Sequence, residues 1–215
     1  MNKKIIISIL AVLLVFSVVL LAACANDNSG ASDDSGKTTI SENESNINSE
    51  NTVPVEINDA TDVINNVLAT YSEDQKFASW GGMQEAPTDS KAGLMNLSDK
   101  DAVNGLLHTT NEILDKTDEV ASLVHLMNAN TFTSGSFKLK DADTADDFSK
   151  ELKDSVLATK WMCGFPEKFV AFSINDGEYV VYAVGNGQAI DYFASQIKTV
   201  MGENAVLVAE EEIKV

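Results

Sequence analysis

Hydrophobic and polar positions divide the chain into three parts. Residues 5–23 are apolar except for two serines, residues 25–53 are rich in Ser, Asn, Asp, Glu, Thr and Gly, and from residue 54 onward apolar positions recur with helical or strand periods. The middle part contains too little apolar surface to offset the entropy lost on folding, which predicts a disordered tether. The periodic part, residues 54–215, has the length of one domain and needs no disulfide or metal to fold.

Residues 54–130 predict the helical part of that domain. Apolar residues from about Asp59 to Tyr71 share one helical face, which predicts a short amphipathic helix. The next segment, residues 72–96, is long for a loop without structure of its own. It is either a loop ordered by packing of Trp80 or a segment with an element that the pattern does not reveal.

A longer apolar repeat begins near Ser98. Ser98 and Asp101, three positions on, form a capping-box arrangement with Asp in place of the usual Glu. Apolar residues then return every 3, 4 or 7 positions as far as Met127. This pattern predicts one long helix with an apolar stripe that must pack against other apolar residues.

Residues 136–215 predict alternating strands and helices. The expected elements are a strand over 136–140, a helix that begins at Thr144, strands over 169–174 and 179–184 joined through Asn175-Asp176-Gly177, a helix marked by apolar residues from Ile190 to Val200, and a strand over 205–209. The turn sequence is a strong hairpin signal.

The resulting β-α-β-β-α-β order is that of the split βαβ, or ferredoxin-like, motif. Short connections and right-handed crossovers would place both helices on one face of a four-stranded antiparallel sheet. The hairpin strands are apolar at positions of both parities, so the second face also needs a cover, which the long helix from Ser98 would supply. The predicted fold class is α+β, with N-terminal helices, one of them long, packed on a C-terminal ferredoxin-like antiparallel sheet.

The N-terminus has the order of an export signal. Lys3 and Lys4 precede the apolar run, which ends in Leu21-Ala22-Ala23-Cys24. A basic start, an apolar stretch and small residues at its end predict a cleaved signal peptide, with the basic end kept in the cytoplasm. The apolar run is also long enough for an uncleaved membrane helix, which would place the domain on the same side.

The last four residues of this leader resemble the lipobox of bacterial lipoproteins. In that family the cysteine thiol receives a diacylglyceryl group, and a peptidase then cuts before the cysteine. The resemblance implies a signal peptide over residues 1–23, a lipid anchor at Cys24, a tether over residues 24–53 and a domain on the outer face of the cytoplasmic membrane. Two acyl chains anchor a protein stably where one would not. The long polar tether resembles those of Gram-positive lipoproteins and favours such a host.

The charge of the chain argues against nucleic acid as a partner. The formal net charge is −18, and loss of Lys3 and Lys4 with the leader would bring it to about −20. Such a surface repels phosphate backbones and anionic lipid headgroups. Acidity favours solubility and does not specify a ligand.

The cysteine count excludes a disulfide framework. If Cys24 carries lipid, Cys163 has no partner within the chain. A reactive thiol at Cys163 would need a neighbouring base or a helix N-terminus, whereas the helix predicted before it would present its C-terminus. Packing of Cys163 as a small hydrophobic residue is therefore the favoured interpretation.

The histidines and the acidic run do not form a metal site in the sequence. His108 and His125 are 17 positions apart on the predicted long helix, which turns them about 100° from each other. The run from Asp141 to Asp147 begins like a calcium loop, but Asp146 stands where the loop needs glycine and position 12 is not Glu. These acids are better placed to stabilise a helix N-terminus.

Two other features are candidates for binding. Gly185-Asn186-Gly187 lies between a strand and a helix but lacks the further residues of a phosphate loop, so it predicts a tight turn. Trp80 and Trp161, each close to glycine, either form a binding surface or complete an edge of the core. No catalytic, cofactor-binding or metal-binding residues are predicted.

Residues 136–215 also resemble uncharacterised domains on small lipoproteins of clostridia and their relatives, through the 161–168 stretch, the hairpin turn and the helix that follows. No activity is assigned to these domains. The leading hypothesis is therefore a non-enzymatic lipoprotein whose domain binds a protein, a wall polymer or a small ligand. The alternatives are an extracytoplasmic enzyme whose site assembles only in three dimensions, and a ligand-capturing component of a transporter.

Overall fold

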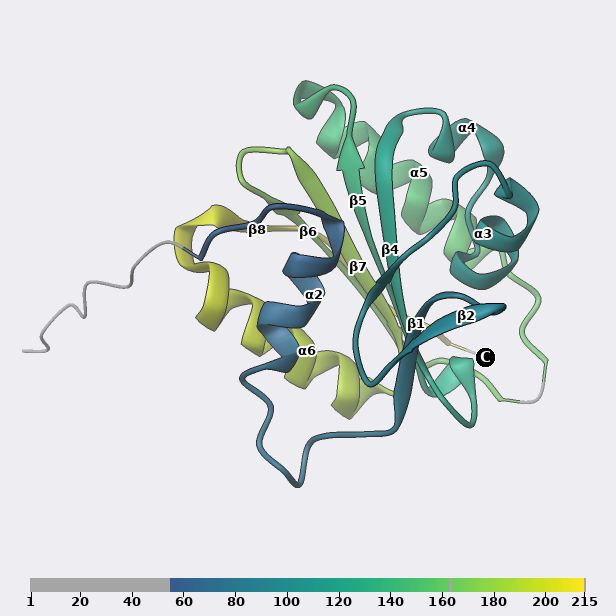
Figure 1. Ribbon diagram of the computed structural model, residues 1–215, viewed down its shortest axis with the longest axis vertical. Helices are drawn as coiled ribbons and strands as arrows, with labels where there is room; N and C mark the ends of the chain where they lie inside the picture. Colours follow the sequence, from purple (N-terminus) through teal and green to yellow (C-terminus); the bar gives the residue numbers. More distant parts are fainter. Residues whose placement is uncertain (1–54, 163, 215) are drawn as a thin grey trace, which may run out of the picture. The chain divides into compact units, whose positions relative to one another are not determined.

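The computed structural model describes residues 55–162 and 164–214 (Figure 1). The predicted signal peptide 1–23, Cys24 with its tether 24–53, and Cys163 lie outside these residues. Within the described ranges, no helix is long and apolar enough to cross a membrane.

The described part of the chain forms an eight-stranded antiparallel sheet with helices on both faces, which confirms the α+β class. The strand order is β2-β1-β4-β5-β7-β6-β8, and β3 pairs with β4. The strands are β1 (Ser79–Met83), β2 (Ala86–Asp89), β3 (Gly93–Leu94), β4 (Thr117–His125), β5 (Phe132–Leu139), β6 (Lys168–Ile174), β7 (Tyr179–Gly185) and β8 (Ala205–Glu212). The α-helices are α2 (Ala60–Leu68), α3 (Lys100–Leu107), α4 (Asn111–Leu114), α5 (Ala145–Leu157) and α6 (Gly187–Met201).

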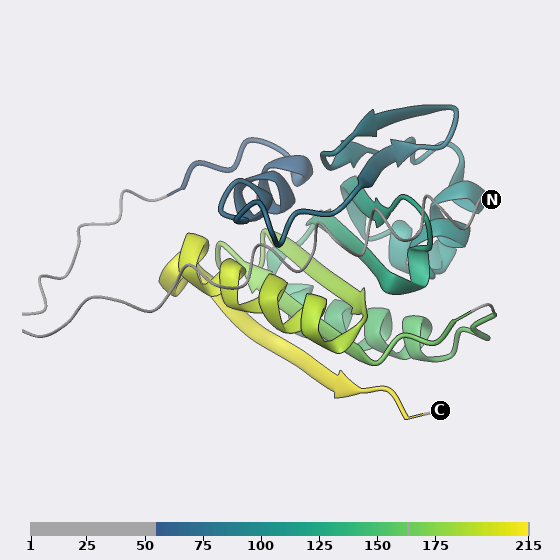
Figure 2. The same ribbon diagram turned by 90° about the horizontal axis from the view of Figure 1, so that it is seen from below.

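Two separate apolar cores lie on the two faces of this sheet. On one face, α2 and α6 lie side by side and pack on the strands (Figures 1 and 2). On the other face, α3, α4 and α5 pack on the opposite side chains of the same strands. Because both faces are covered, the central strands β6 and β7 are buried along almost their whole length.

The ferredoxin-like arrangement is not found, although the β-α-β-β-α-β order of elements is. In that arrangement the last strand would lie beside β5, but β8 pairs with β6 and β4 occupies the place beside β5. The two crossovers, β5-α5-β6 and β7-α6-β8, therefore both move across the sheet toward the β8 edge. They start from β5 and β7, which are antiparallel to each other. Right-handed crossovers of this kind place their helices on opposite faces. The prediction that both helices share one face was wrong for this reason.

The predicted long helix from Ser98 to Met127 was also wrong. Helix α3 begins after the N-cap Asp99. It ends at the C-cap His108, whose backbone is left-handed with φ 55° and ψ 38°. The short helix α4 follows, and then strand β4. In β4, Val120 packs in one core and Ala121 and Leu123 pack in the other, so apolar side chains are needed on both faces of the strand. The apolar residues of a strand that is covered on both faces can therefore have the same spacing as the apolar stripe of a helix.

Residues 72–96 do contain elements that the sequence pattern did not reveal. They form β1, β2 and β3, which are short and include three glycines and Pro87. The hairpin turn between β6 and β7 was predicted correctly, with Asn175 and Asp176 at φ 51° and 53° and Gly177 at φ 94°. The helices expected near 59–71, after Thr144 and near 190–200 are α2, α5 and α6.

A nearly buried lysine fastens the edge strand β8 and helix α6 to the sheet. The side chain of Lys168, at the start of β6, is 11% exposed, and its Nζ lies 2.6 Å from Asp191 Oδ1 and 2.6 Å from Glu210 Oε1. Glu212 Oε1 is 3.5 Å away. Hydrogen bonds to Asp191 and Glu210 raise the pKa of Lys168, so the amine stays charged.

Replacing Lys168 with methionine is expected to lower the free energy of unfolding by about 2 kcal/mol, because hydrogen bonds to a charged group contribute about 1.5–3 kcal/mol. The matched control is Lys150→Met, at an exposed position of α5, for which we expect a change below about 0.5 kcal/mol. Urea denaturation measures both variants. Equal effects in the two variants would show that the cluster does not fasten β8.

Candidate binding surface

The hairpin formed by β1 and β2 presents Trp80 at the edge of the sheet. Trp80 lies between Val124 of β4 and Asp89 of β2 in the strand register. Met83 pairs with Ala86, which leaves Gln84 and Glu85 as a two-residue turn. The Trp80 side chain is half-buried, whereas all four residues of β2 are exposed.

Close backbone contacts hold this hairpin against β3 and β4. A Cβ atom on Gly81 would lie 2.3 Å from Ser122 O and 2.4 Å from Gly93 N, so only glycine fits there. The buried Ser122 hydroxyl accepts a hydrogen bond from the Gly82 N–H at 2.9 Å and donates to Gly82 O at 3.3 Å. Trp80 is therefore mounted on a firmly held element, as a preorganised binding residue requires.

Trp80 and Gln84 line two adjoining hollows. One hollow, of about 290 Å³, is lined by Trp80, Gln84, Pro87, Asp89 and Leu126. The other, of about 320 Å³, reaches from the hairpin to α3 and is lined by Trp80, Met83, Gln84, Glu85, Met95, Ala102, Gly105 and Leu106. We call the two hollows together the Trp80 groove.

Neighbouring contacts fix the two ends of the groove. At one end, the Leu126 N–H donates to Ala78 O at 2.9 Å, which places the Leu126 side chain, 56% exposed, beside β1. At the other end, the buried Tyr182 hydroxyl donates to Leu107 O at 2.7 Å and holds the end of α3 on the sheet. Residues from four separate segments of the chain thus converge on one surface.

The chemistry of the groove favours binding over catalysis. An aromatic ring and several apolar side chains are combined with one amide and two carboxylates, Gln84, Glu85 and Asp89. Pockets of this composition bind ligands through apolar contact and a few orienting polar groups. The lining residues include no histidine, cysteine, serine or lysine that could act as a nucleophile with an adjacent base.

Trp161, the second candidate, lies elsewhere and lines neither hollow. Its ring meets the His108 ring edge-on, with the centroids 4.5 Å apart, and it packs against the core on the α5 face. Its buried indole N–H has no hydrogen-bond partner among the described residues. The structure therefore does not bring the two tryptophans together, and Trp161 completes an edge of the core.

The histidines serve as packing residues. His125 stacks on Phe77 with ring centroids 5.6 Å apart, and its Nδ1 accepts hydrogen bonds from the Met127 and Asn128 N–H groups. Burial lowers the pKa of His108 below its ordinary value of 6.5. His108 is therefore neutral in the folded protein at pH 7.

Because of this shift, His108 should make the protein less stable in mild acid. Below pH 6.5 the unfolded chain binds a proton at His108 that the folded chain does not, so stability falls as the pH drops from 6.5 toward the lowered pKa of the folded state. In His108→Asn, which tolerates the same backbone conformation, this contribution is absent. Chemical denaturation at pH 7 and pH 5 should show a larger loss for the wild type; equal losses would contradict the assignment.

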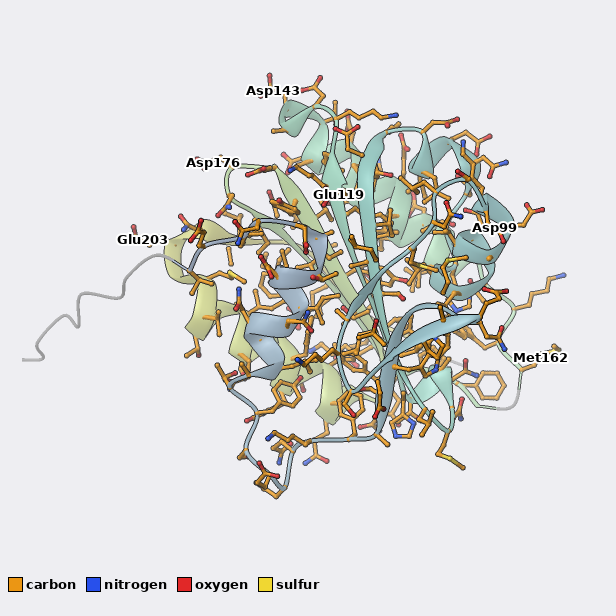
Figure 3. All side chains as sticks on the ribbon, viewed as in Figure 1. Asp99, Glu119, Asp143, Met162, Asp176 and Glu203 are labelled. Carbon is orange, nitrogen blue, oxygen red and sulfur yellow. The ribbon has the colours of Figure 1, made fainter. Side chains whose placement is uncertain are left out.

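The other sequence motifs have structural roles. Asp141 Oδ1 accepts a hydrogen bond from the Asp143 N–H at 3.1 Å, and the acids that follow lie in the first turn of α5 (Figure 3 labels Asp143). At Gly185-Asn186-Gly187, the Glu167 carboxylate accepts a hydrogen bond from the Gly187 N–H at 2.8 Å, so a side chain already occupies the N-terminus of α6. Among the described residues, no group of three or more His, Cys, Asp or Glu side chains could hold a metal ion.

The sequence pattern missed most of the groove. Gln84 and Glu85 lie in the segment that appeared irregular, and a Gln-Glu pair is a weak turn signal. Leu106 and Leu126 were placed on one long helix, whereas they belong to α3 and to the connection after β4. The pairing of β1 with β4 and the packing of α3 on the sheet bring these residues to one surface.

Comparison of the chain with protein-family models, with curated proteins and with solved structures finds no match.

Proposed function

We propose that this chain is a lipid-anchored, extracytoplasmic binding module that holds its partner in the Trp80 groove. The observation that carries the proposal is the groove itself, in which a half-buried tryptophan on a firmly held hairpin lines both hollows. Large aromatic residues of this kind contribute much of the binding energy at interfaces. The lipobox-like end of the leader, at Cys24, supports the anchor and the location.

A non-enzymatic role is favoured over an extracytoplasmic enzyme. The tyrosines whose pKa values burial raises most, Tyr71 and Tyr182, do not line the Trp80 groove. Tyr182 is fully buried in the core, and Tyr71 lines a smaller cavity of about 140 Å³. An enzyme site would be expected to gather several shifted groups in one pocket.

The test of binding is a pull-down from chemically crosslinked cells that carry either the wild type or Trp80→Ala. We expect the wild type to recover a discrete partner and the variant to recover at least tenfold less of it, because hot-spot tryptophans contribute about 2 kcal/mol or more. The matched control is Trp161→Phe, which should recover the wild-type amount. Equal recovery by all three proteins would contradict the assignment of the groove.

The test of the anchor is separate. Metabolic labelling with a fatty-acid probe should label the wild type and fail for Cys24→Ala, and the variant should leave the membrane fraction. Equal labelling of both forms would refute lipidation at Cys24 without bearing on the groove.

A further inference from the structure

The charges that line the Trp80 groove are all negative. Of the lining residues of the two hollows, Glu85 and Asp89 are the charged ones: Asp89 is the cross-strand neighbour of Trp80 and lines one hollow, and Glu85 lies in the hairpin turn and lines the other. Both side chains are exposed. An anionic ligand would meet these two carboxylates with no compensating cation from the lining, so the groove is unsuited to phosphate, carboxylate or sulfate groups.

Trp80 adds a second preference for positive charge. A tryptophan ring attracts a cation placed over its face more strongly than tyrosine or phenylalanine does. The attraction grows where the cation is partly removed from water, and the half-buried position of Trp80 provides such a site. An aromatic ring that shares its lining with carboxylates suits an ammonium or guanidinium group.

The free edge of β2 is poorly suited to pairing with another strand. The Ser90 N–H donates to Ser79 O at 2.9 Å, so these two residues form a hydrogen-bonded pair at the end of the β1–β2 ladder. Because such pairs alternate along an antiparallel ladder, the backbone polar groups of Pro87 and Asp89 point away from β1. Pro87 has no N–H, so regular strand addition to this edge would lack a donor there. Side chains of the groove are therefore better placed than the strand edge to contact a ligand, and the outward carbonyl groups add acceptors that suit a donor-rich cation.

We infer that the Trp80 groove binds a segment of a partner polypeptide that carries a lysine or arginine next to an apolar residue. The cationic group lies over the Trp80 ring, with Asp89 of one hollow and Glu85 of the other as its counter-charges, and the apolar side chain enters the hollow beside Pro87 and Leu126. Two adjoining hollows that share one aromatic ring fit two successive anchors better than one small ligand. This inference rests on the proposed function and specifies the partner of the same site.

The test follows the emission of Trp80 in the full chain carrying Trp161→Phe, during titration with tetralysine at low salt. We expect saturable quenching, at least about tenfold weaker binding for tetralysine acetylated on its side-chain amines, and loss of binding at high salt. Calorimetry on the wild-type chain supplies the same comparison if Trp161→Phe fails to fold. Equal binding of tetralysine and its acetylated form would overturn the inference.

Matched variants separate the groove from the general acidity of the chain. Asp89→Asn and Glu85→Gln should each weaken tetralysine binding by about three- to tenfold. Asp176→Asn and Glu203→Gln make the same charge changes at exposed positions outside the groove, and both residues are labelled in Figure 3. We expect these controls to stay within twofold of the wild type, and equal weakening in both sets would overturn the inference in favour of diffuse charge attraction.

Two further outcomes distinguish this inference from the proposed function. If a neutral N-acetylglucosamine trimer quenches Trp80 and tetralysine does not, the groove binds a glycan, and the inference falls while the proposed function stands. If tetralysine does not bind but cellular crosslinking still depends on Trp80, the inference also falls alone. If crosslinking is independent of Trp80, the proposed function falls as well.

Discussion

Truncation of Phe148 or of Phe193 to alanine is expected to lower the free energy of unfolding by about 3–5 kcal/mol in each case. Both side chains are fully buried, Phe148 on α5 against Phe137 and Phe193 on α6 against Phe132, with ring centroids 5.4 Å apart in each pair. Removing a buried phenylalanine ring loses its apolar burial and leaves a cavity. Urea or thermal denaturation of the two variants measures the effect.

Combining milder substitutions at these positions tests the two-faced arrangement of the sheet. Phe148→Leu and Phe193→Leu should be additive within about 0.5 kcal/mol, because the two helices pack in separate cores on opposite faces. The control is the pair Phe148→Leu and Phe137→Leu, whose rings are in contact and should couple by about 0.5 kcal/mol or more. Coupling between Phe148 and Phe193 as strong as in the control would indicate helices that share one face.

The second large effect is expected at Gly81, where alanine should lower the free energy of unfolding by about 3 kcal/mol. The new Cβ would meet backbone atoms of Ser122, Gly93 and Lys91 at 2.3 to 2.6 Å, and backbone cannot yield as a flexible side chain would. This lies at the upper end of the cost of overpacking. The hairpin must shift, so the emission of Trp80 in a Trp161→Phe background should change as well.

Gly105→Ala is the matched control for this substitution. Gly105 lies inside α3, and an added Cβ there would meet nothing within 4 Å. Because alanine favours a helix interior over glycine, the variant should gain about 0.8–1 kcal/mol. If Gly81→Ala were as stable as the wild type and left the Trp80 emission unchanged, the prediction would be contradicted. Close packing of β1 against β3 and β4 would then not determine the position of Trp80.

Local sequence signals predicted the elements whose backbone the residues themselves dictate. The Asn175-Asp176-Gly177 turn fixes the β6–β7 hairpin because these residues tolerate positive φ. Helices α2, α5 and α6 each bury one face, so their period is visible in the sequence. For these elements, local preference and tertiary packing agree.

Elements defined by distant contacts could not be predicted in this way. Strand β4 is apolar toward both cores, and its spacing therefore resembles a helix that ends near Met127. Strands β1 to β3 are held by the approach of Gly81 and Ser122, which are 41 positions apart and have no sequence signal in common. Strand β8 lies beside β6 because β4 occupies the place beside β5, and the local sequence of β8 carries no signal for that choice.

The candidate site shows the same division. Trp80 was identified as a residue that either binds or completes a core edge, and the structure places it in a groove. Its partner in that hypothesis, Trp161, packs on His108 instead. The residues that give the groove its charge became candidates only in the folded hairpin, which places Asp89 opposite Trp80 and Glu85 in the turn that lines the second hollow.

Site-specific photocrosslinking in intact cells tests the central claim most directly. A photoreactive p-benzoylphenylalanine at Gln84, an exposed turn residue that lines both hollows, should give a discrete crosslinked species that disappears when Trp80→Ala is added. The same group at Glu203, exposed at the end of α6, should not give that species. Identical products from both positions, or a Gln84 product that persists without Trp80, would contradict the proposal that the Trp80 groove holds the partner.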